Sequence, residues 1–416
     1  MKDMELAKEY ALIGAALIDG NGGVPAKNTT VVIRNGVIEQ IGDRESVRLE
    51  NSIQKVDISG YYLMPGLIDA HVHFTGVRSA NPMDWITESN YLEAIRTVAD
   101  ARKILDYGFT TVRSGGSRYD IYLKRAIEEG TIVGPRIMSC GLGLCRTGGN
   151  QDAMPRDVYG IPDVWAQQAY VWAQPCDGVE EIRKAIRKLV GQNVDHIKFF
   201  ATGGGLWGKD RVEDVHFGLE EMRAIVDEAH MVGLRVMCHA ENLRGIRTAV
   251  GLGVDTIEHG DNEEGCELDE ETCQIMAEKN IFLTPTLSIN FVGESADEGL
   301  PDYVINGWKR AINNGVKVLL GSDAHADPVT PYGKYNIGEI KLLVDILGLI
   351  PLEAITSATK FGAEACGIDS RVGTIEKGKL ADLLVLKEDP TSNIDILLDK
   401  GNIRYIIKEG NLVVEH

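Results

Sequence analysis

The sequence lacks the features that would place the protein in a membrane, on a nucleic acid or in a secretory pathway. None of its apolar runs reaches the roughly 18 residues that a membrane-spanning helix needs. The start, MKDMELAKEY, is charged and has no apolar core, so we expect no signal peptide. Basic residues are outnumbered, with 43 Lys and Arg against 62 Asp and Glu and a net charge of −19. Nucleic acids and anionic membranes attract basic surfaces, and we therefore expect neither as a partner.

The cysteines also lack a pattern. There are seven, an odd number, and no C-x-x-C pair occurs, so neither a disulfide framework nor a Cys-based zinc finger is supported. Free thiols in a reducing compartment are the simplest interpretation, and we expect a cytoplasmic location. Hydrophobic residues make up 44% and charged residues 25% of the 416 residues, which is typical of a globular chain. At about 150 residues per domain, the length predicts two or three domains.

What the sequence does contain is a β-rich pattern at both ends. Runs such as TTVVIRNGVIEQIG near the start and IRYIIKEGNLVVEH at the end alternate β-branched and polar residues and are punctuated by Gly or Asn-Gly. Neither end is large enough to bury a core alone. We therefore predict one small composite β-sandwich domain built from residues 1–64 and 367–416.

Between these ends, apolar strands alternate with helical patterns. Eight segments are predicted as strands: Leu67–His73, Thr110–Ser114, Arg136–Leu142, His196–Ala201, Arg235–His239, Thr256–His259, Ile281–Leu287 and Lys317–Ser322. Eight is the number of strands in an α/β (β/α)8 TIM barrel, which we assign to residues 65–366. A doubly wound sheet would need a Gly-rich phosphate loop after its first strand, and LIDAHVHFTG has none.

Metal-ligating residue types stand at the predicted strand ends. His71 and His73 are two residues apart on the first strand, so both imidazoles face the same side. His239, His259 and Asp323 close the fifth, sixth and eighth strands. Because all strand ends of a barrel meet at one face, these side chains would form a nitrogen- and oxygen-rich site that suits Zn²⁺ or Mn²⁺.

Lys198, in the fourth-strand segment HIKFFATGG, is flanked by apolar residues and would lie beside the metals. Desolvation lowers the pKa of a lysine amine, and a neutral amine reacts with carbon dioxide to a carbamate whose two oxygens can bridge two cations. The alternative is a lysine that snorkels to solvent or pairs with an acid. Next to a metal site, we favour N6-carboxylysine.

Together these motifs resemble those of the amidohydrolase superfamily. The segments PGLIDAHVH, HIKFFATGG, CHAE, TIEHG and LLGSDAH are similar to its binuclear type with a carboxylated lysine, and the resemblance covers essentially the whole chain. The prolidase-like (Xaa-Pro dipeptidase) and imidazolonepropionase-like branch is the most similar. Mononuclear deaminases of this superfamily usually carry His-x-x-Glu, whereas this chain has His239-Ala240-Glu241 and keeps Lys198. Deamination and imidazolone ring opening are therefore disfavoured.

The resemblance implies two divalent metal ions, with Zn²⁺ expected and Mn²⁺, Co²⁺ or Fe²⁺ as alternatives. It assigns the ligands in three groups: His71, His73 and Asp323 on one ion, His239 and His259 on the other, and carboxylated Lys198 between them. A hydroxide bridging the ions would attack the substrate carbonyl, and Asp323 would be the general acid–base.

The resemblance also implies a small-molecule substrate with an amide bond, either a dipeptide (Xaa-Pro-like) or an N-acyl amino acid. A lactone, carbamate or cyclic amide is the alternative substrate, since the same hydroxide attacks any of these carbonyls. A catalytically silent homologue is disfavoured because it would need neither Lys198 nor Asp323. Relatives often use a His after Thr-Gly-Gly to hold a substrate carboxylate; here Asn150 takes that position, and Arg146 and Arg113 are the candidate cations.

Further candidates come from loops. His216 and His325 are candidates for substrate contact, whereas His196 and His230 are expected to be structural. The aromatic-rich loop over residues 145–177 is typical of a lid or binding loop, with an oligomer contact as the alternative. Its aromatic residues are Tyr159, Trp165, Tyr170 and Trp172. Trp207 is predicted in the pocket wall or the core. The assembly is open between a monomer and a homo-oligomer, which is frequent in the family.

Overall fold

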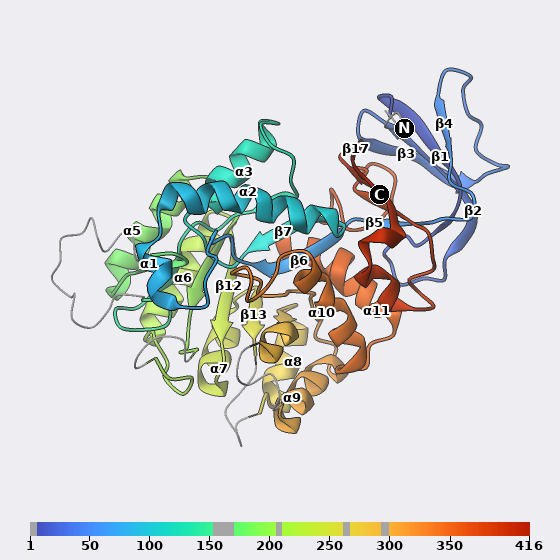
Figure 1. The fold of residues 1–416 in the computed structure, drawn as a ribbon. Helices are drawn as coiled ribbons and strands as arrows, with labels where there is room; N and C mark the ends of the chain where they lie inside the picture. The colour runs from blue at the N-terminus through green and yellow to red at the C-terminus, as the bar shows by residue number, and fades with distance from the viewer. Residues whose placement is uncertain (1–5, 153–169, 205–209, 261–266, 293–298) are drawn as a thin grey trace.

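The structure is a computed structural model that describes residues 6–152, 170–204, 210–260, 267–292 and 299–416. It has mixed α/β content, with a body of strands and surrounding helices and a separate sheet near the two chain ends (Figure 1). Tyr159, Trp165 and Trp207 lie outside the described residues. Of the helices that are described, none is both long and apolar enough to cross a membrane. The described cysteines are all free thiols.

One sheet combines strands from both ends of the chain. Its order is β17-β16-β15-β5-β1-β2-β3, with β4 paired to β1. The junction between the two ends is the antiparallel pair of β5 and β15. The strands are β1 (Glu9–Leu17), β2 (Ala26–Arg34), β3 (Val37–Asp43), β4 (Gln54–Asp57), β5 (Tyr62–Pro65), β15 (Leu383–Leu386), β16 (Ile403–Lys408) and β17 (Asn411–Glu415).

Apolar side chains from both ends stabilise this sheet. Leu12 and Leu63 from the N-terminal part form a buried cluster with Leu383 and Ile407 from the C-terminal part. The Tyr10 hydroxyl donates a hydrogen bond to the Gly410 carbonyl at 3.0 Å, again joining the two ends. Because the buried residues of this cluster come from both ends, neither end alone could complete it, which explains why both ends contribute to one sheet. The domain boundaries at 64/65 and 366/367 stay a prediction.

The body contains parallel strands in two groups, β6-β7-β8 and β10-β9-β11-β12-β13-β14. Their bounds are β6 (Leu67–Val72), β7 (Phe109–Ser114), β8 (Arg136–Met138), β9 (Gly143–Cys145), β10 (Ala173–Pro175), β11 (His196–Phe200), β12 (Arg235–Ala240), β13 (Thr256–His259) and β14 (Phe282–Thr284). Most positions of these strands are buried, as expected for parallel strands that are covered on both faces.

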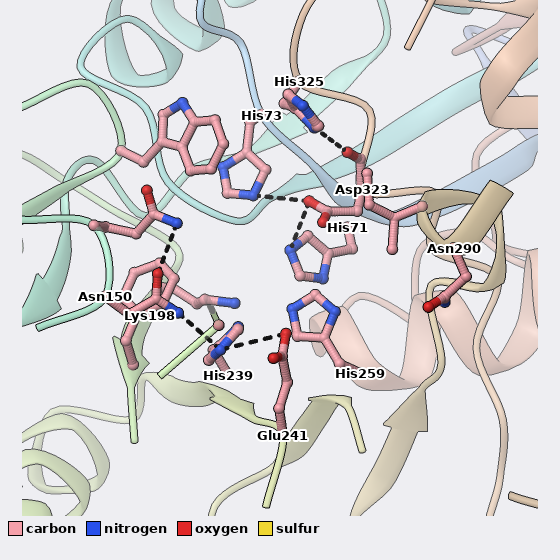
Figure 2. A pocket seen from close by; sticks show the side chains of 15 residues that line it. His71, His73, Asn150, Lys198, His239, Glu241, His259, Asn290, Asp323 and His325 are labelled. Atoms are coloured by element: carbon pink, nitrogen blue, oxygen red, sulfur yellow. Dashed lines mark hydrogen bonds and ion pairs between the residues drawn. The ribbon is translucent and has the colours of Figure 1, made fainter. Parts of the chain in front are cut away.

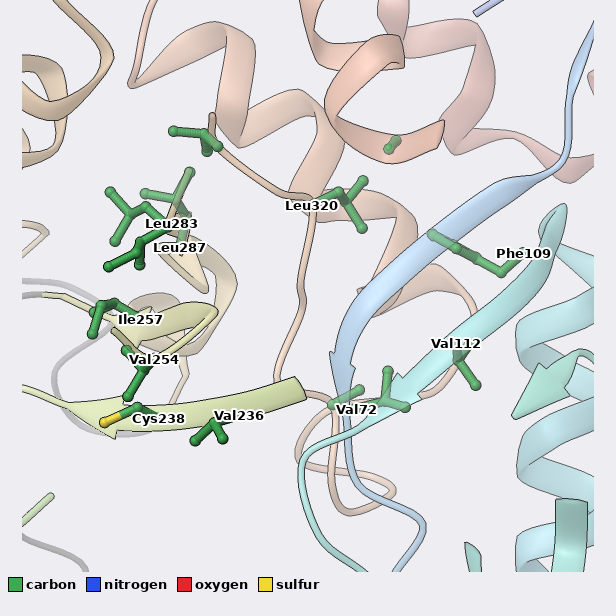
Figure 3. Packing of buried hydrophobic residues seen from close by; sticks show 14 of the residues in the cluster. Val72, Phe109, Val112, Val236, Cys238, Val254, Ile257, Leu283, Leu287 and Leu320 are labelled. Carbon is green, nitrogen blue, oxygen red and sulfur yellow. The ribbon is translucent and has the colours of Figure 1, made fainter. Parts of the chain in front are cut away.

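Helices cover the outside of these strands (Figure 1). They are α1 (Pro82–Thr87), α2 (Asn90–Asp106), α3 (Asp120–Glu128), α5 (Gly178–Gly191), α6 (Leu219–Met231), α7 (Leu243–Leu252), α8 (Glu270–Glu278), α9 (Asp302–Asn313), α10 (Lys334–Asp345), α11 (Pro351–Thr356) and α12 (Gly362–Cys366), with short helical turns η2 (Leu287–Phe291), η4 (Ser357–Phe361), η5 (Ile394–Leu398) and η6 (Lys400–Asn402). Figure 3 shows the apolar packing that includes Val236, Ile257 and Leu283. Cys238 packs in this cluster, as strand alternation predicts for a neighbour of His239.

The segment Lys317–Ser322 differs from its prediction as a strand. Within the described residues it forms only isolated bridges, Val318 with Leu283 and, just beyond it, Ala324 with Val72. The reason lies in Asp69, whose carboxylate accepts the backbone N–H of Ser322 at 3.1 Å and its hydroxyl at 2.6 Å. A side chain thus takes a ladder hydrogen bond, and the chain then leaves the extended conformation at Asp323, where φ is +55°. The segment still contacts both groups of strands.

Candidate metal centre and substrate cavity

A cavity of about 300 Å³ lies at the carboxyl ends of β6, β11, β12 and β13 (Figure 2). Its walls combine imidazoles, carboxylates, carboxamides and apolar side chains. The lining residues are His71, His73, Asn150, Gln151, Trp172, Lys198, Phe200, Gly204, His239, Glu241, His259, Ile289, Asn290, Asp323 and His325. The six predicted metal ligands are therefore all brought to one cavity.

Three of these side chains converge on one side. The Asp323 Oδ1 atom lies 3.1 Å from His73 Nε2 and 3.5 Å from His71 Nε2. The other ring nitrogen of each histidine is occupied: His71 Nδ1 lies 2.9 Å from Glu258 Oε2, and His73 Nδ1 lies 2.8 Å from the Gly116 carbonyl. With Nδ1 as the donor in both rings, each Nε2 presents a lone pair towards Asp323.

His239 and His259 form the other side, with ring centroids 4.5 Å apart. His259 is held through Nδ1, which lies 2.8 Å from Thr286 Oγ1. The Thr286 hydroxyl itself donates to the Pro285 carbonyl, so its oxygen accepts the His259 proton. His259 has φ +68°, a left-handed conformation that redirects the chain where β13 ends. Burial lowers the pKa of His259 to about 3, so its imidazole is neutral and able to ligate.

Lys198 lies between these two sides, and its amine is a buried polar group of the cavity. It is 1% exposed, and its Nζ atom has no hydrogen-bond partner among the described residues. The Lys198 Nζ atom lies over the Phe200 ring, 5.0 Å from its centroid. Burial lowers the pKa of the Lys198 amine, although Glu258 and Asp323 oppose this. A buried amine without a partner is the group that carboxylation would satisfy.

Glu258 and Arg113 form a buried pair behind His71. The Arg113 guanidinium donates to Glu258 Oε1 at 2.8 Å, to the Ala70 carbonyl and to Thr256 Oγ1. The structure therefore does not bring Arg113 to the cavity wall, and its contacts are those of a structural ion pair. Sequence reasoning missed Glu258, although its place beside His259 in TIEHG is a usable signal. Burial raises its pKa, but Arg113 and His71 together hold it below the usual value.

The remaining substrate candidates divide into two groups. Asn150 and His325 line the cavity: Asn150 Nδ2 lies 2.9 Å from His239 Nε2, and His325 Nδ1 lies 2.8 Å from the Asp323 carbonyl. His216 and Arg146 do not line it. His216 supports Asn150 from behind, accepting the Asn150 backbone N–H at Nδ1 and facing Asp210 at 3.1 Å through Nε2.

His196 and His230 have structural contacts, with the Ser114 carbonyl and Asp255 respectively. The described part of the aromatic loop contributes Trp172. Its ring stacks on His73, with centroids 4.6 Å apart and an interplanar angle of 25°. It also contacts Trp85 and His325, so one wall of the cavity is aromatic.

The donor set fits divalent cations. Two sets of three residues bring their ligand atoms within 4.8 Å of one another. The first set is His71, His259 and Asp323, and the second is His239, Glu241 and His259. Burial lowers the pKa of His71 to about 4, and it lowers the pKa of His239 well below its usual value, so neutral imidazoles face the cavity. Neutral imidazoles and carboxylates are ligands of Zn²⁺ and similar first-row ions.

Comparison with known proteins identifies the family. The model of the amidohydrolase family matches residues 62–413, which is most of the chain. The chain belongs to the amidohydrolase family. Ochratoxinase from Aspergillus niger is 29% identical over 438 aligned positions, covering 97% of this chain and 86% of that protein. Imidazolonepropionase from Symbiobacterium thermophilum is 30% identical and covers 92% of this chain and 89% of that protein.

The amidohydrolase chain is also similar to solved structures. A prolidase complexed with N-methylphosphonate-L-proline is 33% identical, with a TM-score of 0.88 and coverage of 98% of this chain and 100% of that chain. A Xaa-Pro dipeptidase with bound methionine is 29% identical, with a TM-score of 0.83 and the same coverage. These relatives confirm the resemblance to the prolidase-like branch and the prediction of a hydrolase acting on C–N bonds.

Proposed function

We propose that this amidohydrolase hydrolyses the amide bond of a dipeptide (Xaa-Pro-like) or an N-acyl amino acid in a two-cation site. The observation that carries the proposal is Lys198, a buried amine without a hydrogen-bond partner among the described residues, between two groups of histidines. The prolidase relative binds a phosphonate joined to proline, which supports the substrate class.

The proposed ligands follow from the side chains that face one another. His71, His73 and Asp323 would hold one cation, His239 and His259 the other, and Lys198 both. For Lys198 to do so, its neutral amine adds to carbon dioxide and releases one proton, giving a carbamate with two oxygens. When bound, the cations lower the pKa of a water ligand towards neutrality and polarise the substrate carbonyl. Zn²⁺ is the proposed ion.

Asp323 is the proposed general acid–base. Although burial raises its pKa, the imidazoles of His71, His73 and His259 hold it well below the usual value, so the carboxylate is ionised at neutral pH. It faces the cavity with 15% of its side chain exposed. Asp323 accepts the proton of the attacking water and returns it to the leaving nitrogen, which departs as a neutral amine.

The cavity wall determines which substrates fit. Its described part presents the carboxamides of Asn150, Gln151 and Asn290 and the aromatic ring of Trp172, but no arginine. Carboxamide N–H groups can hold a substrate carboxylate, which suits a dipeptide. The lack of an arginine in this described lining favours, as the second candidate, a neutral lactone, carbamate or cyclic amide hydrolysed in the same site.

A substrate panel tests the proposal. Purified protein, loaded with Zn²⁺ in bicarbonate buffer, is assayed against Xaa-Pro dipeptides, N-acyl amino acids, their C-terminal amides, lactones and carbamates. We expect turnover of the compounds with a free carboxylate, and slower turnover of the amides. Turnover of neutral compounds alone would establish the second candidate. A folded protein without stoichiometric divalent metal would contradict both, and Asp323→Asn is the inactive control.

We also propose that the strands of the body, completed by the segment from Lys317 to Ala324, close into a (β/α)8 barrel. The bridges of Val318 with Leu283 and of Ala324 with Val72 support the closure. Residues 65–366 would form this barrel domain, with residues 1–64 and 367–416 as its β-sandwich partner.

A further inference from the structure

Glu241 is a carboxylate of the cavity to which the proposed two-cation site gives no role. It follows β12 by one residue and is two residues beyond His239, so its side chain is on the same side of the chain as that imidazole. Figure 2 shows it reaching between His239 and His259. Its side chain is 17% exposed, which places the carboxylate in the cavity rather than in bulk solvent.

The spacing of Glu241 is that of a ligand. Its Oε1 atom lies 3.6 Å from His239 Nε2, which is longer than a hydrogen bond. Two ligands at 2.0–2.2 Å from one tetrahedral zinc ion are about 3.4 Å apart. The pairs on the opposite side, His73 and His71 with Asp323, show 3.1 Å and 3.5 Å. The atoms of His239, Glu241 and His259 also lie within 4.8 Å of one another.

Charge gives a second argument. The first proposed cation has an anionic ligand of its own in Asp323, whereas the other ligands of the second cation, His239 and His259, are imidazoles and bind a metal in their neutral form. Without Glu241, the second cation would share only the carbamate of Lys198. A dication in a buried site is stabilised by anionic ligands, and Glu241 is the carboxylate grouped with both of these histidines.

The backbone around Glu241 holds it in place. Its N–H donates to the Thr202 hydroxyl at 2.9 Å, tying the end of β12 to the end of β11. The next residue, Asn242, is the N-cap of α7 and accepts the Gly245 N–H at 2.8 Å. Glu241 thus stands on a short fixed connection, as a preorganised ligand requires.

We infer that Glu241 is a direct ligand of the second cation, completing a His239–Glu241–His259 set. This inference rests on the proposed two-cation site. The inferred role differs from that of a carboxylate that follows the fifth strand and contacts the substrate. Glu241 instead faces the imidazoles of His239 and His259, the proposed ligands of the second cation.

Metal titration tests the inference. Chelator-stripped protein and its Glu241→Gln variant are titrated with Co²⁺ in bicarbonate buffer, reading bound ions by elemental analysis and coordination by the visible absorption spectrum. We expect two ions in the wild type, and a second ion bound at least about tenfold more weakly in Glu241→Gln, with a changed spectrum. Glu213→Gln, which removes an exposed acid from a neighbouring loop, should match the wild type.

Glu241→Asp serves as the second variant, since it keeps the charge but withdraws the carboxylate by one methylene. We expect Glu241→Asp to weaken the binding of the second ion as well. If both variants bind two ions with wild-type affinity and spectrum, the inference is wrong and the two-cation proposal survives. A change in KM alone, with metal binding intact, would overturn it in favour of a substrate contact. A wild type that binds no ion overturns the proposed function and this inference together.

Discussion

At the scale of single residues, the orientation of His71 depends on a charge that never reaches the cavity. Glu258 accepts from His71 Nδ1 and from the Arg113 guanidinium, and it is fully buried. The Thr256 hydroxyl also donates to it. Because Glu258 is ionised and fixed from three sides, it selects the His71 tautomer that presents Nε2 to the cavity.

Replacing Glu258 should therefore impair both stability and metal binding. Glu258→Gln leaves the Arg113 guanidinium buried without an anion, which costs about 3–5 kcal/mol of unfolding free energy in urea denaturation. It should also weaken metal affinity by about 10–100-fold. Adding Arg113→Met should restore much of the stability but not the affinity. Recovery of both in the double variant would contradict an orienting role.

Lys198 gives a second prediction at this scale. Lys198→Ala should lose bound metal and activity, and a short carboxylic acid that fills the gap should restore part of each, because it replaces the carbamate oxygens. Lys188→Ala, an exposed lysine on α5, is the matched control. Full activity of Lys198→Ala after chelator treatment would refute the bridging role.

The sequence predicted the positions of some of these residues but not of others. Strand ends and i, i+2 spacing were enough to select His71, His73 and His239 as neighbours, because both rules hold for parallel strands in general. Arg113 could not be excluded from the cavity by the same rules, since its partner Glu258 lies 145 positions further along the chain. Only the folded structure shows that Arg113, at the end of its strand, pairs with Glu258 and does not face the cavity.

At the scale of elements, one helix fixes a wall of the cavity. Glu339 on α10 accepts the backbone N–H groups of Leu287 and Ser288, both at 2.8 Å, and the Ser288 hydroxyl at 2.6 Å. These residues begin η2, which carries Ile289 and Asn290 into the cavity. The N–H groups of η2 are thereby satisfied from a neighbouring helix.

The hydrogen bonds of Glu339 with Leu287 and Ser288 predict that the stability of the protein depends on pH. Burial raises the pKa of Glu339 to about 7, against the opposing hydrogen bonds from Ser288 and Leu287, while its ordinary value is 4.5. Between these values the folded state keeps a proton that the unfolded state releases, so the unfolding free energy falls as pH rises, by up to about 3 kcal/mol.

Urea denaturation from pH 4 to 8 measures this fall. Glu339→Gln is less stable because it loses acceptors, but its unfolding free energy should lack the fall over this window. Asp345→Asn, at an exposed acid of the same helix, should run parallel to the wild type. Parallel curves for wild type and Glu339→Gln would show that Glu339 does not titrate in this range.

Helices and strands were predicted correctly where the local sequence pattern determines the secondary structure. The helices over DGVEEIRKAIRKLVGQ and GLEEMRAIVDEAHMVG appear as α5 and α6, because their apolar spacing and Gly ends suffice. The segment Lys317–Ser322 was not predicted correctly, because Asp69, far away in sequence, replaces part of its ladder. Tertiary hydrogen bonds of that kind leave no local signal.

At the scale of the whole molecule, Arg136 joins the body to the terminal sheet. From β8 it pairs with Asp382 at 2.6 Å, just before β15, and with Glu409 at 2.5 Å, in the turn between β16 and β17. Arg136→Ala should lower the unfolding free energy by about 3–5 kcal/mol, since Asp382 stays buried and unpaired.

Arg136→Lys should rescue little, because an ammonium does not span both carboxylates as a guanidinium does. Arg136→Met combined with Asp382→Asn should recover more, since no charge remains buried. Thermal denaturation of the four proteins ranks them, and an unchanged midpoint for Arg136→Ala would mean that the ion pairs do not stabilise the junction.

The pairing of β5 with β15 has a consequence for synthesis. About 320 residues separate Pro65 from Leu383, so at about 5–20 residues per second a ribosome needs from roughly a quarter of a minute to a minute to reach the partner strand. During that time the N-terminal strands carry an unpaired edge and an uncovered apolar face. Until the last strands emerge, this edge and apolar face of the nascent chain are therefore surfaces that a chaperone can bind.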